Sequence, residues 1–277
     1  MKIWSYATVW NEEKMLEFYL RHYSQFCDKM IFFDNESDDR SREIINSYPN
    51  TEIISFSTGG TFDDGEHMSL KHGAIAHCVG KCDYAIIGDC DEFIYHPNLI
   101  QFLEDHLGKT AVFYPAGFDM ASHEFPNKDL QIYDSIKTGV PNPWYSKPIL
   151  INPNLLEEFE WAGGQHEVYL NCQYGGDIYH VVPESVRPEG EYKGHSWGKW
   201  NIMHDLLHIF KKEPLKLLHY KFIGSEYVTE RHSMYGKRNS QYNIDNNKGA
   251  HYVNTDTFDK TYQEIENLLS NSEKLDI

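Results

Sequence analysis

A short apolar segment is followed directly by a cluster of acidic residues in this sequence. Residues 84–87 are typical of a buried strand, Gly88 bounds the strand as a turn residue, and Asp89, Asp91 and Glu92 come next. If the chain stays extended, Asp89 and Asp91 lie two positions apart on one face. Two carboxylates on one face suit Mg²⁺ or Mn²⁺, with a diphosphate supplying further oxygen ligands. The alternative is a solvated acidic turn, but the apolar residues on both sides favour a metal site.

Polar residues also follow two earlier predicted strands, at residues 2–9 and 30–33. They are Thr8, Asn11 and Glu12 at the end of the first strand, and Asp34 and Asn35 after the second. Such residues can contact a nucleotide, with a helix N-terminus behind them. The alternative is a plain helix cap or turn at each place. Because the carboxyl ends of parallel strands meet at one edge of a sheet, we expect these loops and the acidic run to form one crevice.

A histidine in the second half could add a third ligand to this metal site. His219 lies in the run 217–222, where a neutral imidazole could complete the coordination begun by Asp91. The alternative is a core histidine whose ring nitrogens are satisfied by the backbone.

Three acidic residues of the second half are candidates for a general base. Asp119 and Glu124 lie in the irregular segment 117–126, and Glu167 follows His166 after a glycine turn. A carboxylate there could deprotonate an acceptor hydroxyl if it reaches that group. The alternatives are an exposed loop for the first two residues and a polar hairpin for the third.

An alternation of strands and helices must position these residues. The predicted strands of the first half are 2–9, 30–33, 51–56, 84–87 and 110–114, and the predicted helices are 12–26, 40–48, 67–81 and 98–107. This alternation predicts an α/β fold with a mostly parallel sheet and helices on both faces. In the second half we expect strands at 148–151 and 177–182 and helices at 200–212, 213–218, 227–235 and 258–269. No linker is evident, so we expect a single domain over 1–277, with halves 1–115 and 116–277.

The composition predicts a globular protein and argues against a nucleic-acid partner. Of 277 residues, 40% are hydrophobic and 14% aromatic, and the formal net charge is −17. A broad phosphate-binding surface needs clustered lysine and arginine, which this charge disfavours. Five cysteines without a paired framework indicate free thiols in a reducing compartment. We see no apolar leader and no apolar stretch of about 18 residues, which predicts a cytoplasmic protein.

The ordered series of motifs resembles the bacterial glycosyltransferase family 2-like proteins, which have a GT-A fold. The resemblance covers residues 2–252. In the first half it rests on Trp10-Asn11-Glu12, Asp34-Asn35-x-Ser37-x-Asp39, Asp83-Tyr84 and Asp89-x-Asp91-Glu92-Phe93. In the second half it rests on Tyr145-Ser146-Lys147-Pro148, Gly164-x-His166, Leu217-Leu218-His219-Tyr220-Lys221, Ser225-x-Tyr227 and Arg231.

This resemblance implies a metal-dependent sugar transfer, with 1–115 binding the nucleotide sugar and 116–277 the acceptor. The donor would be a nucleotide-diphosphate sugar and the acceptor a glycan or lipid-linked molecule. The transfer would invert the configuration of the anomeric carbon and would serve bacterial surface polysaccharide synthesis. Peripheral contact of the protein with the inner face of the membrane is left open. Mn²⁺ or Mg²⁺ would be held by Asp89, Asp91 and His219. Donor contacts would come from Thr8, Asn11, Glu12, Asp34, Asn35, Lys71 and Asp89, the base from Asp119, Glu124 or Glu167, and acceptor contacts from Lys147 and His166.

Two other classes of protein remain as alternatives. A non-catalytic nucleotide- or carbohydrate-binding module could keep this fold, although intact Asp89, Asp91 and His219 count against it. A nucleotidyltransferase also combines a nucleotide and a metal on an α/β sheet. Such an enzyme usually has a glycine-rich, basic loop near its N-terminus, and residues 8–13 contain neither glycine nor a basic residue.

Overall fold

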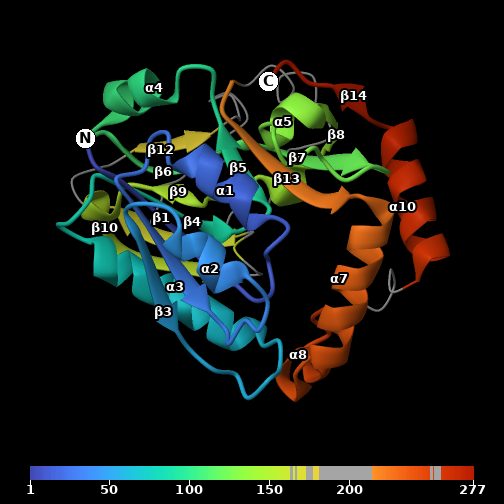
Figure 1. Ribbon diagram of the computed structural model, residues 1–277. Coiled ribbons are helices and arrows are strands. Elements are labelled where there is room, and N and C mark those ends of the chain that lie inside the picture. The colour runs from blue at the N-terminus through green and yellow to red at the C-terminus, as the bar shows by residue number, and fades with distance from the viewer. Residues whose placement is uncertain (163–164, 166, 173–176, 181–213, 250–251, 253–256) are drawn as a thin grey trace.

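Two sheets with helices packed against them form the centre of the protein (Figure 1). The computed structural model describes residues 1–162, 165, 167–172, 177–180, 214–249, 252 and 257–277. The α/β class predicted from the sequence is confirmed. Within the described ranges, no helix is both long and apolar enough to cross a bilayer.

Within the described residues, the central sheet has seven strands. They are β1 (Ile3–Val9), β2 (Lys29–Asp34), β3 (Thr51–Ser55), β4 (Tyr84–Asp89), β6 (Thr110–Tyr114), β9 (Leu150–Ile151) and β12 (Asp177–His180). Their order is β12-β6-β9-β4-β1-β2-β3. Strands β1 to β4 pair in parallel, and the short β9 runs antiparallel between β4 and β6. The predicted strands of the first half are confirmed to within two residues at each end, and the mostly parallel pairing is confirmed.

A second, mixed sheet lies beside the first one. Its described strands are β5 (Glu92–Tyr95), β7 (Ala116–Ser122), β8 (Thr138–Pro141), β13 (Lys216–Ile223) and β14 (Glu273–Lys274), in the order β14-β8-β7-β13-β5. Strand β13 pairs parallel with β7 and antiparallel with β5. Two further strands, β10 (Leu156–Ala162) and β11 (Glu167–Cys172), pair antiparallel with each other.

The helix predicted at 213–218 is wrong, because residues 216–223 form strand β13. Leu217, Leu218 and Tyr220 are fully buried there. A strand with neighbours on both sides and both faces covered has a nearly continuous apolar run. Such a run cannot be told from a buried helix by periodicity alone.

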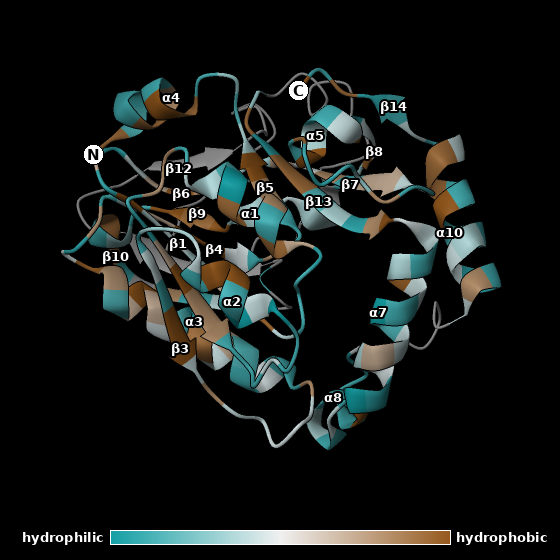
Figure 2. Ribbon diagram, viewed as in Figure 1, coloured by the Kyte–Doolittle hydropathy of each residue, from teal (hydrophilic) through white to brown (hydrophobic). Residues whose placement is uncertain are grey.

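Helices cover both faces of the central sheet and also pack against the second sheet. They are α1 (Leu16–Tyr23), α2 (Ser41–Asn46), α3 (Asp64–Cys78), α4 (Leu99–His106), α5 (Ile132–Ser135), α7 (Ser225–Arg238), α8 (Gln241–Asp245) and α10 (Phe258–Ser270), with 3₁₀ turns η1 (Pro143–Tyr145) and η2 (Pro153–Leu155). The predicted helix at 200–212 lies outside the described residues. Figure 2 shows apolar residues along the strands and a mostly polar α7.

Alternate residues of each central strand face opposite layers of the core. On β1, Ala7 and Val9 pack in the cluster that contains α1 and α2, whereas Tyr6 packs in the cluster that contains α3. Ile86 and Ile87 of β4 divide in the same way. Burial on both faces explains why these strands read as apolar runs.

Two predicted helix boundaries differ from the structure for local reasons. Helix α1 begins at Leu16 and not at residue 12, because the chain turns there and Asn11 has a left-handed φ of 52°. Helix α3 begins three residues earlier than predicted, where the Asp63 carboxylate accepts from the backbone N–H groups of Gly65 and Glu66.

The cysteines whose side chains are described carry free thiols, as predicted. They are Cys27, Cys78, Cys82 and Cys90, and all four are buried.

Candidate functional site

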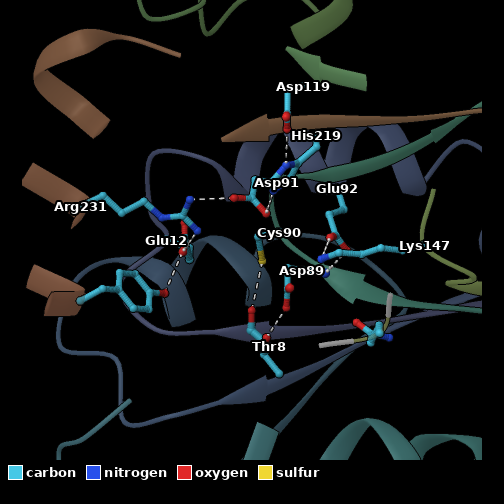
Figure 3. Close-up of polar contacts among 12 residues, drawn as sticks. Thr8, Glu12, Asp89, Cys90, Asp91, Glu92, Asp119, Lys147, His219 and Arg231 are labelled. Carbon is cyan, nitrogen blue, oxygen red and sulfur yellow. Dashed lines mark hydrogen bonds and ion pairs between the residues drawn. The ribbon is translucent and has the colours of Figure 1, made fainter. Parts of the chain in front are cut away.

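The order of the central strands places a crevice at the carboxyl ends of β1 and β4. From β1 the chain adds β2 and β3 on one side, and it then returns to place β4 on the other side of β1. In open α/β sheets, ligands bind where the strand order reverses in this way. Thr8 and Asp89 are opposite each other in the register there, and the Thr8 hydroxyl donates to Asp89 Oδ1 over 2.7 Å (Figure 3).

Asp89 is held as an anion at this position. Lys71 of α3 donates from Nζ to Asp89 Oδ1 over 2.9 Å and to Gln165 Oε1 over 2.7 Å. Burial alone would raise the pKa of Asp89, but the charges of Lys71 and Lys147 hold that pKa well below its usual range. Within the described residues, Asp89 Oδ2 accepts no hydrogen bond, and 33% of the side chain is exposed.

Asp91 makes contacts that differ from those of Asp89. The chain turns at Cys90 and Asp91 and does not stay extended, so the two carboxylates do not simply share a strand face. Arg231 of α7 donates from Nη1 to Asp91 Oδ2 and from Nη2 to Glu12 Oε1, each over 2.7 Å (Figure 3). Burial opposes ionisation of Asp91, but Arg231 and His219 lower its pKa to about 2. Burial raises the pKa of Glu12 even though the same guanidinium acts to lower it.

His219 of β13 lies between two carboxylates. Its Nε2 is 3.9 Å from Asp91 Oδ1, and its Nδ1 is 3.1 Å from Asp119 Oδ1. With the ring hydrogen on Nδ1, His219 donates to Asp119 Oδ1, and Nε2 faces Asp91. Proteins commonly orient a metal-binding histidine with a carboxylate in this way.

The Asp91–His219 pair could hold a metal ion together with a ligand. An ion about 2.1 Å from both atoms would subtend an angle of about 140°, so the two atoms must approach by roughly 1 Å to occupy adjacent octahedral positions. Among the described side chains, however, no group of three or more His, Cys, Asp or Glu converges on one point. The predicted set of Asp89, Asp91 and His219 is therefore not assembled as three ligands. A pair of protein ligands fits Mg²⁺ or Mn²⁺ when substrate phosphates supply the other oxygens.

A buried ion pair supports the acidic turn. Lys147 donates from Nζ to Glu92 Oε1 over 2.6 Å, and the Asp89 N–H donates to Glu92 Oε2 over 3.1 Å. Burial would lower the pKa of Lys147, but the charges of Glu92 and Asp89 raise it above its usual range. Lys147 thus fixes the turn that carries Asp89.

A cavity of about 440 Å³ is lined by Thr8, Glu12, Lys71, Asp89, Asp91, Lys147, His219 and Arg231. One face of α3 contributes Asp64, His67, Met68 and Lys71, which have the spacing of a helix face. The opposite wall comes from β13 and α7, and the remaining wall residues include Trp144, Tyr145, Asn247, Lys248, Gly249 and Tyr252. The cavity is therefore bounded by both halves of the chain.

The structure divides the predicted site residues into two groups. Those that line the cavity are Thr8, Glu12, Lys71, Asp89, Asp91, Lys147 and His219. Asn11, Asp34 and Asn35 are not among the lining residues. Asn11 donates to Asp38 over 2.6 Å, Asp34 forms an ion pair with Arg42 over 2.5 Å, and Asn35 is buried.

The three predicted bases have different surroundings. Asp119 is buried behind His219, and its second oxygen accepts from Asn142 Nδ2 over 2.6 Å. Glu124 is exposed in the loop after β7 and is not among the lining residues. His166 and the Glu167 side chain lie outside the described residues.

Sequence reasoning did not assign a role to the residues of α7. Tyr227, Arg231 and Tyr235 all contact the Glu12 carboxylate, over 3.4, 2.7 and 3.2 Å. Their spacing of four residues places them on one face of the helix, and that pattern could have shown that they act together.

A second residue that was missed is Lys221 of β13. It lines the cavity and is 8% exposed. Burial lowers its pKa to about 8, against the charges of Asp91 and Asp119, which raise it.

Comparison with known proteins shows likeness at the level of the fold. No protein-family model and no curated relative matches the chain. Glucosyl-3-phosphoglycerate synthase from Mycobacterium tuberculosis, solved with Mn²⁺, UDP and glucosyl-3-phosphoglycerate, is similar over 43% of this chain and 44% of its own, with 15% identity and a TM-score of 0.29. A 4-diphosphocytidyl-2C-methyl-D-erythritol synthase from Anaerococcus prevotii is similar over 56% of this chain and 71% of its own, with 16% identity and a TM-score of 0.33. The chain spans less than half the length of the first synthase.

Proposed function

We propose that the chain is a metal-dependent glycosyltransferase. It would move a sugar from a nucleotide-diphosphate donor to a glycan or lipid-linked acceptor, with inversion at the transferred carbon, in bacterial surface polysaccharide synthesis. The observation that best supports this proposal is the cavity at the reversal of strand order, whose wall combines Asp89 and Asp91 with several cations. The assignment of donor binding to residues 1–115 and of acceptor binding to 116–277 belongs to the same proposal.

The residues around Asp91 would bind the metal ion that neutralises the charge of the leaving diphosphate. A bound Mn²⁺ or Mg²⁺ would neutralise the charge that develops there, and Asp91 and His219 would hold the ion. Asp119 fixes the ring of His219 through Nδ1. Arg231 fixes the Asp91 carboxylate through Oδ2 and leaves Oδ1 on the side of His219. The ligand pair is thus oriented before any substrate binds.

The residues around Asp89 would contact the nucleoside. Thr8 and Lys71 occupy Oδ1 of Asp89, and the partly exposed Oδ2 is available to accept from a ribose hydroxyl. Glu12 is held by Arg231 on the same wall of the cavity. Asp89 would therefore bind donor and not metal.

The acceptor hydroxyl needs a carboxylate as base. Asp119 is engaged by His219 and Asn142, and Glu124 does not line the cavity, which leaves Glu167 as a candidate from the sequence alone. Asp64 joins it as a candidate. Asp64 lines the cavity, its carboxylate has no hydrogen bond in the described part of the chain, and burial raises its pKa.

The experiment that tests this function is a substrate panel. We expect the chain to release nucleoside diphosphate from one nucleotide-diphosphate sugar with Mn²⁺, and to stop when EDTA removes the metal. His219→Ala should raise the Mn²⁺ concentration needed for half-maximal rate by roughly 10-fold or more. Pyrophosphate release from a nucleoside triphosphate and a sugar phosphate would instead show a nucleotidyltransferase. Nucleotide binding without turnover on the whole panel would show a non-catalytic module.

A further inference from the structure

Lys221 is a buried cation that makes no direct ion pair in the described part of the chain, although the charges of Asp91 and Asp119 act on it from a distance. Its side chain is at the wall of the cavity, and the residue is only 8% exposed. No hydrogen bond or ion pair of its Nζ occurs there, and its neighbours are the rings of Phe222 and Tyr252, each 5.5 Å from Nζ. Burying an ammonium group without a partner costs free energy. A ligand that brings negative charge would offset that cost.

The alternation of strand β13 directs Lys221 to the cavity: His219 and Lys221 line it, whereas Tyr220 between them packs in the core. His219 pairs with Asp119 of β7, and Phe222 pairs with Ala121, so three steps on β13 oppose two on β7. Lys221 lies within this irregular stretch. Bulges occur frequently beside active sites. The register shift begins after His219, and both His219 and Lys221 remain on the cavity side of the strand.

The other cations that reach the Asp89–Asp91 turn are already engaged. Lys71 is bound to Asp89, Lys147 to Glu92, and Arg231 to Glu12 and Asp91. Each of these contacts is 2.9 Å or shorter and neutralises a carboxylate of the protein. These three cations are therefore largely neutralised, whereas Lys248, which also lines the cavity, donates to the neutral Tyr242 hydroxyl over 3.3 Å. Lys221 has no such contact within the described residues.

We infer that Lys221 binds a phosphate oxyanion of a ligand in this cavity. An ammonium group is a compact charge with three donors and is a common partner of phosphate. The nature of the ligand rests on the proposed function. The diphosphate of the donor would lie beside Asp91 and His219, and Lys221 follows His219 by two residues on the same strand. A charged group of the acceptor is the other source of such an oxyanion.

The test measures binding and not turnover. Full-length wild type, Lys221→Met and Lys221→Arg are titrated by calorimetry with inorganic pyrophosphate, UDP, GDP, ADP and CDP in the presence of Mn²⁺. We expect Lys221→Met to lower the affinity for pyrophosphate and for the most tightly bound nucleoside diphosphate by roughly 10-fold or more, since a hydrogen bond to a charged group is lost. Lys221→Arg should retain most of the affinity.

A matched control separates a local contact from a general loss of charge. Lys237→Met removes the same charge from an exposed position of α7 outside the cavity, and it should bind as wild type does. Lys221→Met should also melt at a higher temperature than wild type without ligand, because an unpaired buried charge is removed. A purely structural lysine would instead lower the melting temperature when replaced.

Further titrations identify the source of the oxyanion. Inorganic phosphate is added to wild type and Lys221→Met, each saturated with Mn²⁺ and nucleoside diphosphate. If Lys221→Met binds inorganic phosphate more weakly than wild type but binds pyrophosphate and the nucleoside diphosphates equally well, Lys221 binds a charged group of the acceptor. Equal binding of every probe by wild type and Lys221→Met overturns the inference and leaves the proposed function standing. A wild type that binds none of the probes overturns both.

Discussion

At the scale of single residues, Arg231 connects parts of the chain that are distant in sequence. Its guanidinium contacts Glu12, 219 residues away, and Asp91, 140 residues away. Both residues are buried, with 3% of Glu12 and 4% of Asp91 exposed. A buried ion pair adds little net stability, but removing one partner leaves an uncompensated charge inside the protein.

We therefore expect Arg231→Met to destabilise the protein strongly. It should lower the free energy of unfolding at pH 7 by about 3–5 kcal/mol, because Glu12 and Asp91 both lose their counter-charge. Arg231→Lys keeps the positive charge but cannot contact both carboxylates as the guanidinium does. It should lower the free energy of unfolding by less than Arg231→Met. Urea denaturation of both variants measures the difference. Unchanged stability in Arg231→Met would show that these acids are protonated or solvated in the folded state.

The sequence predicted the acidic turn, His219, Lys71 and Asp119 as site residues, but not which of them contact one another. Asp89, Asp91 and His219 carry recognisable spacing or lie in a recognisable run. Their partners Lys71, Asp119 and Arg231 come from α3, β7 and α7, and no local pattern records that these elements meet. Long-range pairing of this kind is a property of the folded chain.

At the scale of elements, one glycine sets how closely the 3₁₀ turn η1 crosses strand β7. A Cβ on Gly117 would lie 2.3 Å from the Tyr145 carbonyl carbon and 2.5 Å from the Ser146 nitrogen. Both are backbone atoms that no side-chain rotation can move. The turn leads directly to Lys147, which holds Glu92 and, through it, the acidic turn.

Replacing Gly117 by alanine should therefore separate these two elements. We expect a loss of roughly 3 kcal/mol in the free energy of unfolding, because the clash is with backbone. Gly73→Ala is the matched control: Gly73 is exposed in the interior of α3, with nothing within 4 Å of an added Cβ. That control should gain about 0.5–1 kcal/mol from helix propensity. Equal effects of the two substitutions, read from chemical denaturation, would contradict the close crossing.

Helix α1 carries a histidine that should make stability depend on pH. His22 is buried, its Nε2 is 2.9 Å from the Ile94 carbonyl oxygen, and burial lowers its pKa from 6.5 to about 4. Between these values the unfolded chain takes up a proton that the folded protein does not. Stability should therefore fall as the pH falls from 6.5 to 4, by about 3 kcal/mol at 1.4 kcal/mol per pH unit.

His22→Gln provides the comparison, because glutamine keeps an N–H donor and does not titrate. Unfolding free energies of both proteins are measured from pH 7 to 4.5. We expect the free energy of unfolding of wild type to fall, relative to that of His22→Gln, as the pH falls. Parallel curves would mean that His22 contributes nothing to the pH dependence.

The strands of the first half were predictable because buried parallel strands are short apolar runs that end in polar turns. Strand β13 and the second sheet were not, because their residues give no period that excludes a helix. Pairings such as β13 with β5 and β7 join segments about 100 residues or more apart. Local sequence does not encode them.

At the scale of the whole molecule, the two halves of the chain share one cavity. Thr8, Lys71 and Asp89 come from the first half, and His219 and Arg231 come from the second. Figure 1 shows α7 standing opposite the carboxyl ends of the parallel strands, with α8 beyond it. The sequence pattern was enough to predict the α/β fold and the position of the crevice. The wall formed by β13 and α7 could not be predicted, because it depends on how the second half of the chain packs against the first.

The measurement that tests this account most directly is the Mn²⁺-dependent rate of nucleoside diphosphate release by wild type and Asp91→Asn. Asparagine keeps the size of the side chain and removes the charge that would hold the metal with His219. The account predicts that a folded Asp91→Asn loses at least roughly 10²-fold in rate on the donor sugar that wild type uses. A folded Asp91→Asn that turns over near the wild-type rate at saturating Mn²⁺ would contradict it.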